Sequence, residues 1–86
     1  MAADLSRLDL LLAAHFVVLA EERSFTAAAR RLHLTQSALS KQVRRLETRV
    51  GATLVDRGCR PLVLTRDGEA VLVVYRDLLT RLRRAG

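Results

Sequence analysis

The chain has 86 residues, half of them hydrophobic, which suits a single domain with a small core. Fifteen lysines and arginines against nine aspartates and glutamates give a net charge of +6, and this balance favours a polyanionic partner such as nucleic acid. A membrane protein is not expected, because no segment reaches the roughly 18–20 uninterrupted apolar residues of a spanning helix.

The first predicted helix follows a loose leader, Met1 to Arg7, and ends at about Arg23. Ser6 or Asp9 is its candidate N-cap. Apolar residues occur on nearly every side of this helix, so we expect it to be covered on nearly every side. A long C-terminal helix, or a second subunit, is expected to supply part of that cover.

Two short helices separated by a tight turn come next, the pattern of a helix-turn-helix. Ser24 is the candidate cap of the first helix, which extends to about Leu32. His33 stands in the turn, where many such motifs carry glycine. Thr35 suits the N-cap of the second helix, and Gly51 suits the residue that ends it.

The second of these helices is predicted to have two chemically different sides. Its apolar stripe consists of Leu39, Val43, Leu46 and Val50. The opposite side carries Ser37, Ser40, Lys41, Arg44 and Thr48. A helix that enters the major groove of DNA needs short polar side chains at its leading end and cations for phosphates. A solvated amphipathic surface helix is the alternative interpretation.

A small hairpin, or wing, is predicted after this helix. The runs 54–57 and 62–64 are prone to form β-strands, and the turn residues Gly58-Cys59-Arg60-Pro61 separate them. Arg57 and Arg60 would lie near its tip. An irregular loop is the alternative for this segment.

The last predicted helix is capped by Thr65 and covers roughly Arg66 to Arg84, with acids in its first turn and arginines later, as the helix dipole favours. Its predicted apolar stripe is Val71, Val74, Tyr75, Leu78 and Leu82, widened by Leu72 and Leu79. One face should pack on the first helix. The rest is free to pair with the same helix of a partner.

Nothing in the sequence points to an enzyme, a metal site or a cofactor. His15, His33 and Cys59 are too scattered for a recognisable metal site, and no motif places Ser, His and Asp together. We expect both histidines to be structural. A single cysteine permits no internal disulfide, which fits a reducing cytoplasm.

Nearly the whole chain, from Leu8 to about Leu82, resembles the N-terminal domain of the LysR-type transcriptional regulators. The resemblance is carried by Leu8-Asp9-Leu10 with Phe16, Ala20-Glu21-Glu22-Arg23-Ser24-Phe25-Thr26 with Ala28-Ala29, Leu32-His33-Leu34-Thr35-Gln36-Ser37-Ala38-Leu39-Ser40, Arg45-Leu46-Glu47, Gly51 and Leu54 with Arg57, and Leu64-Thr65-Arg66-Asp67-Gly68. The order and spacing of these pieces are specific to that family.

The resemblance implies a mainly α fold, a winged helix-turn-helix over residues 1–65, with a linker and dimerisation helix at 66–86. It implies a cytoplasmic, nucleoid-associated bacterial protein that binds double-stranded operator DNA as a homodimer through the C-terminal helix. The operator would be an imperfect palindrome. Such regulators sense a small-molecule effector through a further C-terminal domain, which this sequence lacks.

Helix position and the family pattern together predict the DNA-binding residues. Gln36, Ser37, Ser40 and Lys41 are expected to face base edges, with Gln36 suited to adenine and Lys41 to guanine. The residues expected to contact the DNA backbone or the minor groove are Ser24, Thr26, Thr35, Arg44, Arg45, Arg57 and Arg60, the last of them in the minor groove.

Two other classes of function stay open from the sequence. An RNA-binding module is one, although the scarcity of aromatic residues argues against recognition of single strands. The other is a dimerising protein-interaction domain whose basic surface is only solvated.

Overall fold

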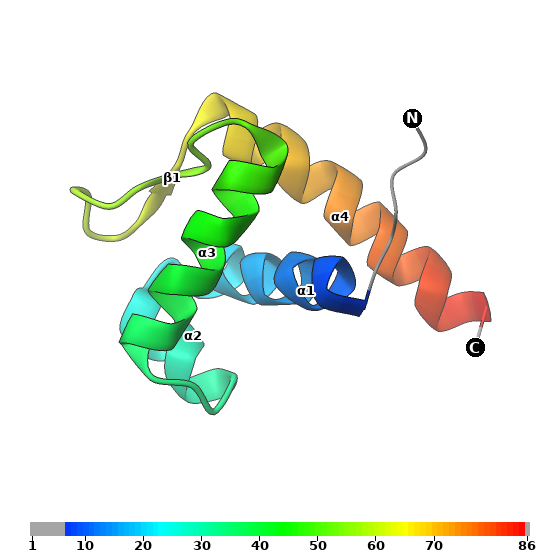
Figure 1. The fold of residues 1–86 in the computed structure, drawn as a ribbon, viewed down its shortest axis with the longest axis horizontal. Coiled ribbons are helices and arrows are strands. Elements are labelled where there is room, and N and C mark those ends of the chain that lie inside the picture. Colours follow the sequence, from blue (N-terminus) through cyan, green and yellow to red (C-terminus); the bar gives the residue numbers. More distant parts are fainter. Residues whose placement is uncertain (1–6, 86) are drawn as a thin grey trace.

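The structure, a computed structural model, describes residues 7–85. The elements follow in the order α1 (Arg7–Glu22), α2 (Phe25–Arg31), α3 (Gln36–Val50), β1 (Val55–Asp56), β2 (Val63–Leu64) and α4 (Arg66–Ala85). Helix α3 crosses α1, the hairpin projects to one side, and α4 runs obliquely past α1 (Figure 1). The predicted winged helix-turn-helix with a long last helix is therefore confirmed.

The helix boundaries follow the predicted caps. The hydroxyl of Ser24 accepts the Ala27 N–H at 3.1 Å, and that of Thr35 accepts the Ala38 N–H at 3.0 Å. Thr65 does the same at the start of α4, where the Gly68 N–H donates to Oγ1 at 3.0 Å. The prediction for α1 was wrong in one respect: the helix already includes Arg7, so Asp9 lies inside it and is not its cap. Ser6 lies outside the described residues.

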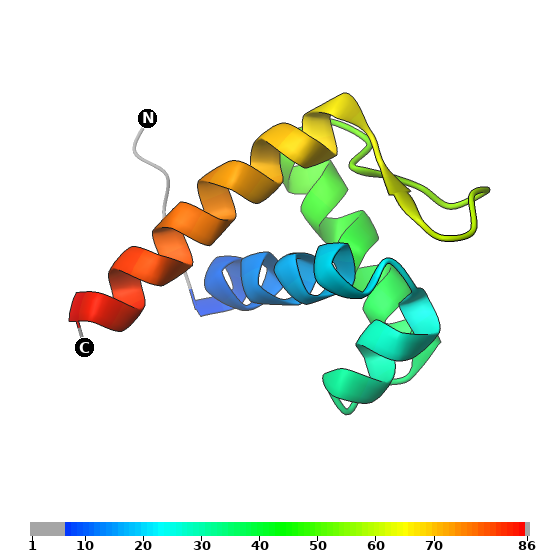
Figure 2. The same ribbon diagram turned by 180° about the vertical axis from the view of Figure 1, so that it is seen from behind.

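The core is built from leucines around Phe16. The largest fully buried side chains are Phe16, Leu12, Leu19, Leu39 and Leu54. Helix α1 touches α2, α3 and α4, so the expected cover comes from within the chain, and Phe16 meets Tyr75 of α4 edge-on with 6.3 Å between ring centroids. Figure 2, the view from behind, shows α4 and α1 in front of α3. Leu11 remains 46% exposed, so the cover is incomplete.

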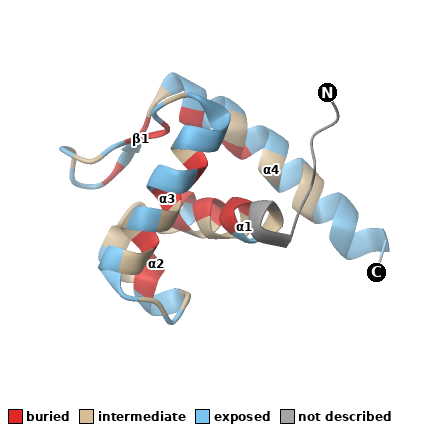
Figure 3. Ribbon diagram, viewed as in Figure 1, coloured by how far each residue is buried: buried red, intermediate tan, exposed pale blue. Residues whose placement is uncertain are grey.

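The wing is a two-stranded antiparallel sheet in which Val55 pairs with Leu64 and Asp56 with Val63. The predicted hairpin is confirmed, but its strands have two residues each. Leu54, Val55, Leu62 and Leu64 are buried and attach the base of the hairpin to the core. The tip is left to project into solvent (Figure 3).

Two predicted apolar stripes differ from the buried faces. Val50 was expected in the stripe of α3, yet it is 40% exposed, because the helix ends there and the chain turns away through the left-handed Gly51. In α4 the buried residues are Gly68 and Leu72, and Tyr75 and Leu79 are partly buried, whereas Val74 is 62% exposed. The C-terminal half of α4 is exposed along most of its surface (Figure 3).

Candidate nucleic-acid interface

Helix α3 presents a polar side to solvent and an apolar side to the core. Leu39, Val43 and Leu46 are at most 3% exposed. The predicted reading side is accessible: Ser40 is half-buried, and the exposed members are Gln36, Ser37, Lys41, Arg44, Arg45 and Thr48. One helix thus holds donors, acceptors and cations in a single accessible row, as insertion into a major groove requires.

The turn between α2 and α3 is closed without glycine. His33 has φ 58°, in the left-handed region that glycine adopts most readily. Its N–H donates to the Arg30 carbonyl at 3.2 Å, and the Leu34 N–H donates to the Ala29 carbonyl at 2.8 Å. The absence of glycine here therefore does not alter the geometry of the helix-turn-helix. His33 is exposed and serves the turn, as expected.

His15 links α1 to α3 through a hydrogen bond between its Nδ1 and Oε1 of Gln42. The histidine is half-buried, in agreement with the structural role expected for it. Within residues 7–85, no group of three or more His, Cys, Asp or Glu side chains is placed to hold a metal ion.

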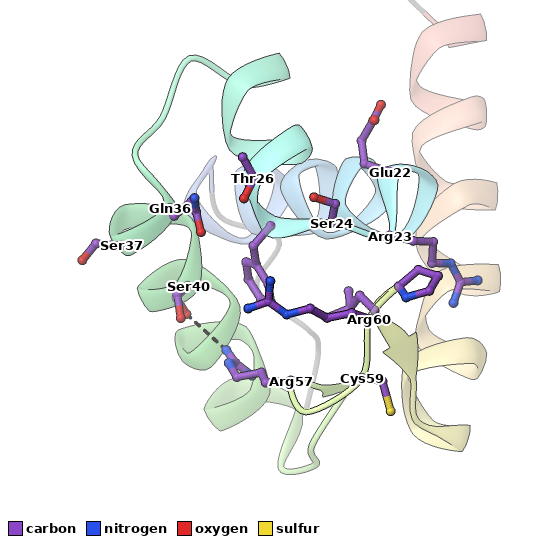
Figure 4. Close-up of a pocket in the computed structure, with 13 residues that line it drawn as sticks. Glu22, Arg23, Ser24, Thr26, Gln36, Ser37, Ser40, Arg57, Cys59 and Arg60 are labelled. Carbon is purple, nitrogen blue, oxygen red and sulfur yellow. Dashed lines mark hydrogen bonds between the residues drawn. The ribbon is translucent and has the colours of Figure 1, made fainter.

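A cleft of about 580 Å³ separates the helix-turn-helix from the wing. It brings together seven of the predicted site residues from α2, α3 and the wing, namely Ser24, Thr26, Gln36, Ser37, Ser40, Arg57 and Arg60. Figure 4 shows the Arg60 side chain extending across the cleft from the wing towards the helices. Four further predicted residues, all exposed, do not line the cleft: Thr35, Lys41, Arg44 and Arg45.

The capping hydroxyls remain able to bind a phosphate. Ser24 and Thr35 each accept one backbone N–H, which leaves their own O–H as a donor. Thr26 is exposed two residues after Ser24, in the first turn of α2. The starts of α2 and α3 therefore offer hydroxyl donors beside the positive ends of two helix dipoles.

The basic residues of the molecule fall into two groups. Arg31 is paired with Glu21 at 2.8 Å and Glu22 at 3.0 Å, and the hydrogen bond with Glu21 is the main reason that its pKa is raised. In contrast, within the described residues no ion-pair partner faces Lys41, Arg44, Arg45 or Arg60. Cations without an ion-pair partner in the described residues thus lie on the polar side of α3 and at the wing, and also on α2 and α4.

Arg57 is held by the protein more firmly than its sequence position suggested. Its guanidinium donates to Oε1 of Glu47 at 3.4 Å and to the Ser40 carbonyl at 3.4 Å, and it lies 5.4 Å from the centre of the Phe25 ring. Its Nε is buried and has no hydrogen-bond partner in the described part of the chain. Arg57 therefore joins the wing to both helices of the helix-turn-helix.

Glu47 is a site residue that the sequence reasoning missed. Its side chain is only 15% exposed, and its Oε2 accepts the Leu54 N–H at 2.7 Å and the Val55 N–H at 3.4 Å. The sequence offered one signal: an acid on a basic helix, within the segment Arg45-Leu46-Glu47 that carries the family resemblance. Its partners come from a different segment, so they could not be predicted.

Cys59 lies on the wing turn and donates from Sγ to Oδ2 of Asp56 at 3.4 Å. This hydrogen bond, followed by partial loss of solvent and the charge of Asp56, raises the pKa of the thiol. A raised pKa keeps the thiol protonated and lowers its reactivity.

Comparison with known proteins identifies relatives of this fold and site. The family model described as "Bacterial regulatory helix-turn-helix protein, lysR family" matches residues 10–69. The transcriptional regulator PgrR of Escherichia coli is 55% identical over 64 residues, which cover 74% of this chain and 21% of PgrR. The regulator PtxR of Pseudomonas aeruginosa is 45% identical over 85 residues, covering 95% of this chain and 27% of PtxR.

Solved structures with the same fold include complexes with DNA. The DNA-binding domain of BenM bound to catB site 1 DNA has a TM-score of 0.85 and 36% identity, over 88% of this chain and 85% of that one. Vibrio fischeri DarR in complex with DNA has a TM-score of 0.85 and 33% identity, over 99% of this chain and 27% of that one. The chain spans about a fifth to a quarter of the length of the two curated regulators PgrR and PtxR.

Proposed function

Because the chain belongs to the LysR family of bacterial regulatory helix-turn-helix proteins and carries its DNA-binding domain, we propose that it regulates transcription as a homodimer on an imperfectly palindromic operator. The observation that carries this proposal is the accessible polar side of α3, whose opposite side is buried. Two copies of α3 in a dimer would enter successive major grooves about one helical turn, roughly 34–36 Å, apart.

Sequence is read by α3 in this proposal. Gln36 can pair with adenine through its amide, and Lys41 can reach the acceptors of guanine, while Ser37 and Ser40 contact either kind of base. All four lie on the side of α3 away from the core, and Gln36, Ser37 and Lys41 are exposed. Ser40 is half-buried at the edge of the cleft, so it requires the closest approach of DNA.

The backbone contacts fix the position of the duplex without reading its sequence. Arg44 and Arg45 are exposed and without an ion-pair partner in residues 7–85, so they can neutralise phosphates on either side of the groove. Hydroxyls of Ser24, Thr26 and Thr35 bind phosphates at the starts of α2 and α3. Because each neutralised phosphate releases counterions, these contacts should make the affinity for DNA depend on salt.

The wing contributes through two arginines with different roles. Arg60 is exposed at the mouth of the cleft and can enter the minor groove beside the major groove that α3 occupies. Arg57 is 27% exposed and already contacts α3, so it reaches the DNA backbone only with the part of the guanidinium that faces the cleft.

Dimerisation is assigned to α4. Val74 is 62% exposed and Leu82 45% exposed on this helix, and a second copy of α4 would bury both. We assign residues 1–65 to DNA binding and 66–86 to the linker and dimer interface. In the intact regulator, a further domain would sense a small-molecule effector, and the protein would act at the nucleoid in the bacterial cytoplasm.

The protein-interaction alternative from the sequence is not favoured. A protein-interaction domain with a merely solvated basic surface does not account for structural neighbours that are bound to DNA. The relatives are named as transcriptional regulators, which also argues against an enzyme. No helix in residues 7–85 has the length and hydrophobicity needed to cross a membrane.

Titration with three nucleic acids tests the proposed function. We expect the chain to bind duplex DNA from a selected library more tightly than single-stranded DNA or RNA of the same sequence, with light scattering reporting two chains per duplex. If each subunit neutralises about four phosphates, Z is near 8 and the slope of log K against log salt is roughly −7. Equal affinity for all three nucleic acids, or a slope near zero, would contradict the proposal.

A further inference from the structure

The wing has few contacts of its own to fix its direction. Its strands have two residues each, and an isolated hairpin of that size is not stable in water. The orientation of its tip must therefore be set by contacts with the helices. On the β2 side the Leu62 N–H donates to the Arg23 carbonyl at 2.8 Å, and on the β1 side the polar contacts converge on one carboxylate, that of Glu47 in the last turns of α3.

Glu47 contacts both ends of β1. Oε2 accepts the Leu54 N–H at 2.7 Å just before the strand, and Oε1 accepts from Arg57 at 3.4 Å just after it. The carboxylate is thus shared between the backbone that enters the wing and the side chain that leads to its tip. With 15% of the Glu47 side chain exposed, water competes little for these hydrogen bonds.

Arg57 extends the connection to the other end of α3. It donates to the Ser40 carbonyl, seven residues and about two helical turns from Glu47, and it also faces the Phe25 ring of α2. Because Glu47 holds one amino group of the guanidinium, the other is directed at Ser40 (Figure 4). These contacts therefore fix the position of the wing relative to the part of α3 that carries Gln36, Ser40 and Lys41.

We propose that Glu47 is a positioning residue, which through Leu54 and Arg57 fixes the wing so that Arg60 reaches the minor groove while α3 lies in the major groove. The inference rests on the proposed function. Glu47 itself need not touch DNA: its carboxylate would be repelled by phosphates, and its hydrogen bonds are all made within the protein.

A double-mutant cycle between Glu47 and Arg60 tests this proposal. The wild-type chain, E47Q, R60A and E47Q/R60A are titrated against one duplex selected from a random library by the wild-type chain. Glutamine keeps an acceptor for the Leu54 N–H but loses the charge that orients Arg57. Thermal unfolding of each variant is followed in parallel, and hydroxyl-radical footprints report minor-groove protection.

The proposal predicts that the two substitutions are not additive. R60A is expected to weaken binding roughly tenfold, a value within the range for a single good groove contact. E47Q should weaken it by a similar factor and remove the same minor-groove protection, while E47Q/R60A should bind within about twofold of R60A alone. Methylation protection at guanine N7 in the major groove should be retained in all variants.

The matched control is E21Q, which removes the same charge from another arginine-paired glutamate, away from the wing. Loss of any negative charge should raise the affinity for DNA, and E21Q measures the size of that effect. If E47Q unfolds below the assay temperature, R57K replaces it in the cycle. Lysine keeps the positive charge but cannot contact Glu47 and Ser40 together. The effects of R57K and R60A are then expected to be non-additive in the same way.

The outcomes distinguish failure of the positioning role from failure of DNA binding. Additive effects of E47Q and R60A, or an unchanged minor-groove footprint in E47Q, would overturn the positioning role while leaving DNA binding intact. An R60A variant that binds like the wild type would also overturn it, because no wing contact would exist to be positioned. Failure of the wild-type chain to select any duplex would overturn the proposed function itself.

Discussion

Gly68 lies where α4 approaches the backbone of the chain before β1. A Cβ at this position would be 2.0 Å from the Leu54 carbonyl oxygen, a distance that no side-chain movement can relieve because the obstacle is backbone. The same carbonyl accepts the Thr65 N–H at 3.0 Å. Gly68 therefore allows the first turn of α4 to pack directly on the base of the wing.

We predict that Gly68→Ala lowers the free energy of unfolding by about 3 kcal/mol, as a strained, overpacked contact does. The gain in helix propensity from alanine, about 1 kcal/mol, is too small to offset this cost. Urea denaturation measures the difference. The control is Gly58→Ala, whose Cβ would lie 3.4 Å from Oδ1 of Asp56, and which should change stability by less than about 1 kcal/mol. Similar stability for the two variants would contradict the packing argument.

Cys59 is predicted to react slowly with iodoacetamide, since Asp56 accepts its S–H and raises the pKa of the thiol. The alkylation rate should thus rise with pH along a curve whose midpoint lies above that of an unperturbed cysteine, about 8.5. Asp56→Asn keeps Oδ1 as the acceptor for the Gly58 N–H but removes the charge. The variant should react several-fold faster at pH 7.5. Equal rates in the two proteins would exclude control by Asp56.

At the residue scale, the sequence predicted what depends on neighbours along the chain. Ser24, Thr35, Thr65 and Gly51 were identified because a cap acts within three or four residues of its position. The roles of Gly68 and Glu47 depend on a segment that lies seven or more residues away in sequence. Local patterns contain no information about such contacts.

At the scale of single elements, α3 was predicted well because its two faces have opposite chemistry. The buried residues Leu39, Val43 and Leu46 repeat at helical spacing, and the polar residues fill the other side. Periodicity failed only at Val50, where the helix ends. The candidate site on this helix consists of polar side chains opposite the apolar stripe, so its residues could be proposed from the sequence alone.

Lys41 and Arg44 test most sharply whether base reading and phosphate binding belong to different residues of α3, since both are exposed cations one turn apart. Lys41→Ala should relax preference at one base pair, at a cost of about 1–3 kcal/mol for the preferred duplex and little for the others. Arg44→Ala should weaken all duplexes alike and reduce the salt slope by about 1. Competition binding against single-base variants of the selected duplex measures both. If Lys41→Ala left discrimination unchanged, Lys41 would not read a base.

The rotation of α4 was predicted less well than its length. The apolar residues of this helix cover two neighbouring faces, so periodicity alone could not decide which one is buried. The close approach of Gly68 to Leu54 decides it, because it turns the row Gly68, Leu72, Tyr75 and Leu79 towards the core. Val74 and Leu82, which belong to the predicted apolar stripe, consequently lie outside the packed face.

At the scale of the whole molecule, this rotation leaves Val74 and Leu82 exposed, and we assign the proposed dimer interface to them. We predict that Val74→Glu raises the dimer dissociation constant about tenfold or more, since burying one valine contributes about 1.5–3 kcal/mol. Light scattering across a concentration series measures the change. The control is Val63→Glu, which introduces the same charge at a wing residue that is 47% exposed. Equal masses for the two variants at every concentration would place the interface elsewhere.

The central claim is that the polar side of α3 and the wing lie along duplex DNA. Backbone amide chemical shifts, recorded while the selected duplex is added to the isotope-labelled chain, test it most directly. The account predicts that the largest changes fall at residues 24–26, 35–45 and 57–61, and that they do not occur with the same single strand. Changes confined to α1 and α4, or identical changes with single-stranded DNA, would contradict it.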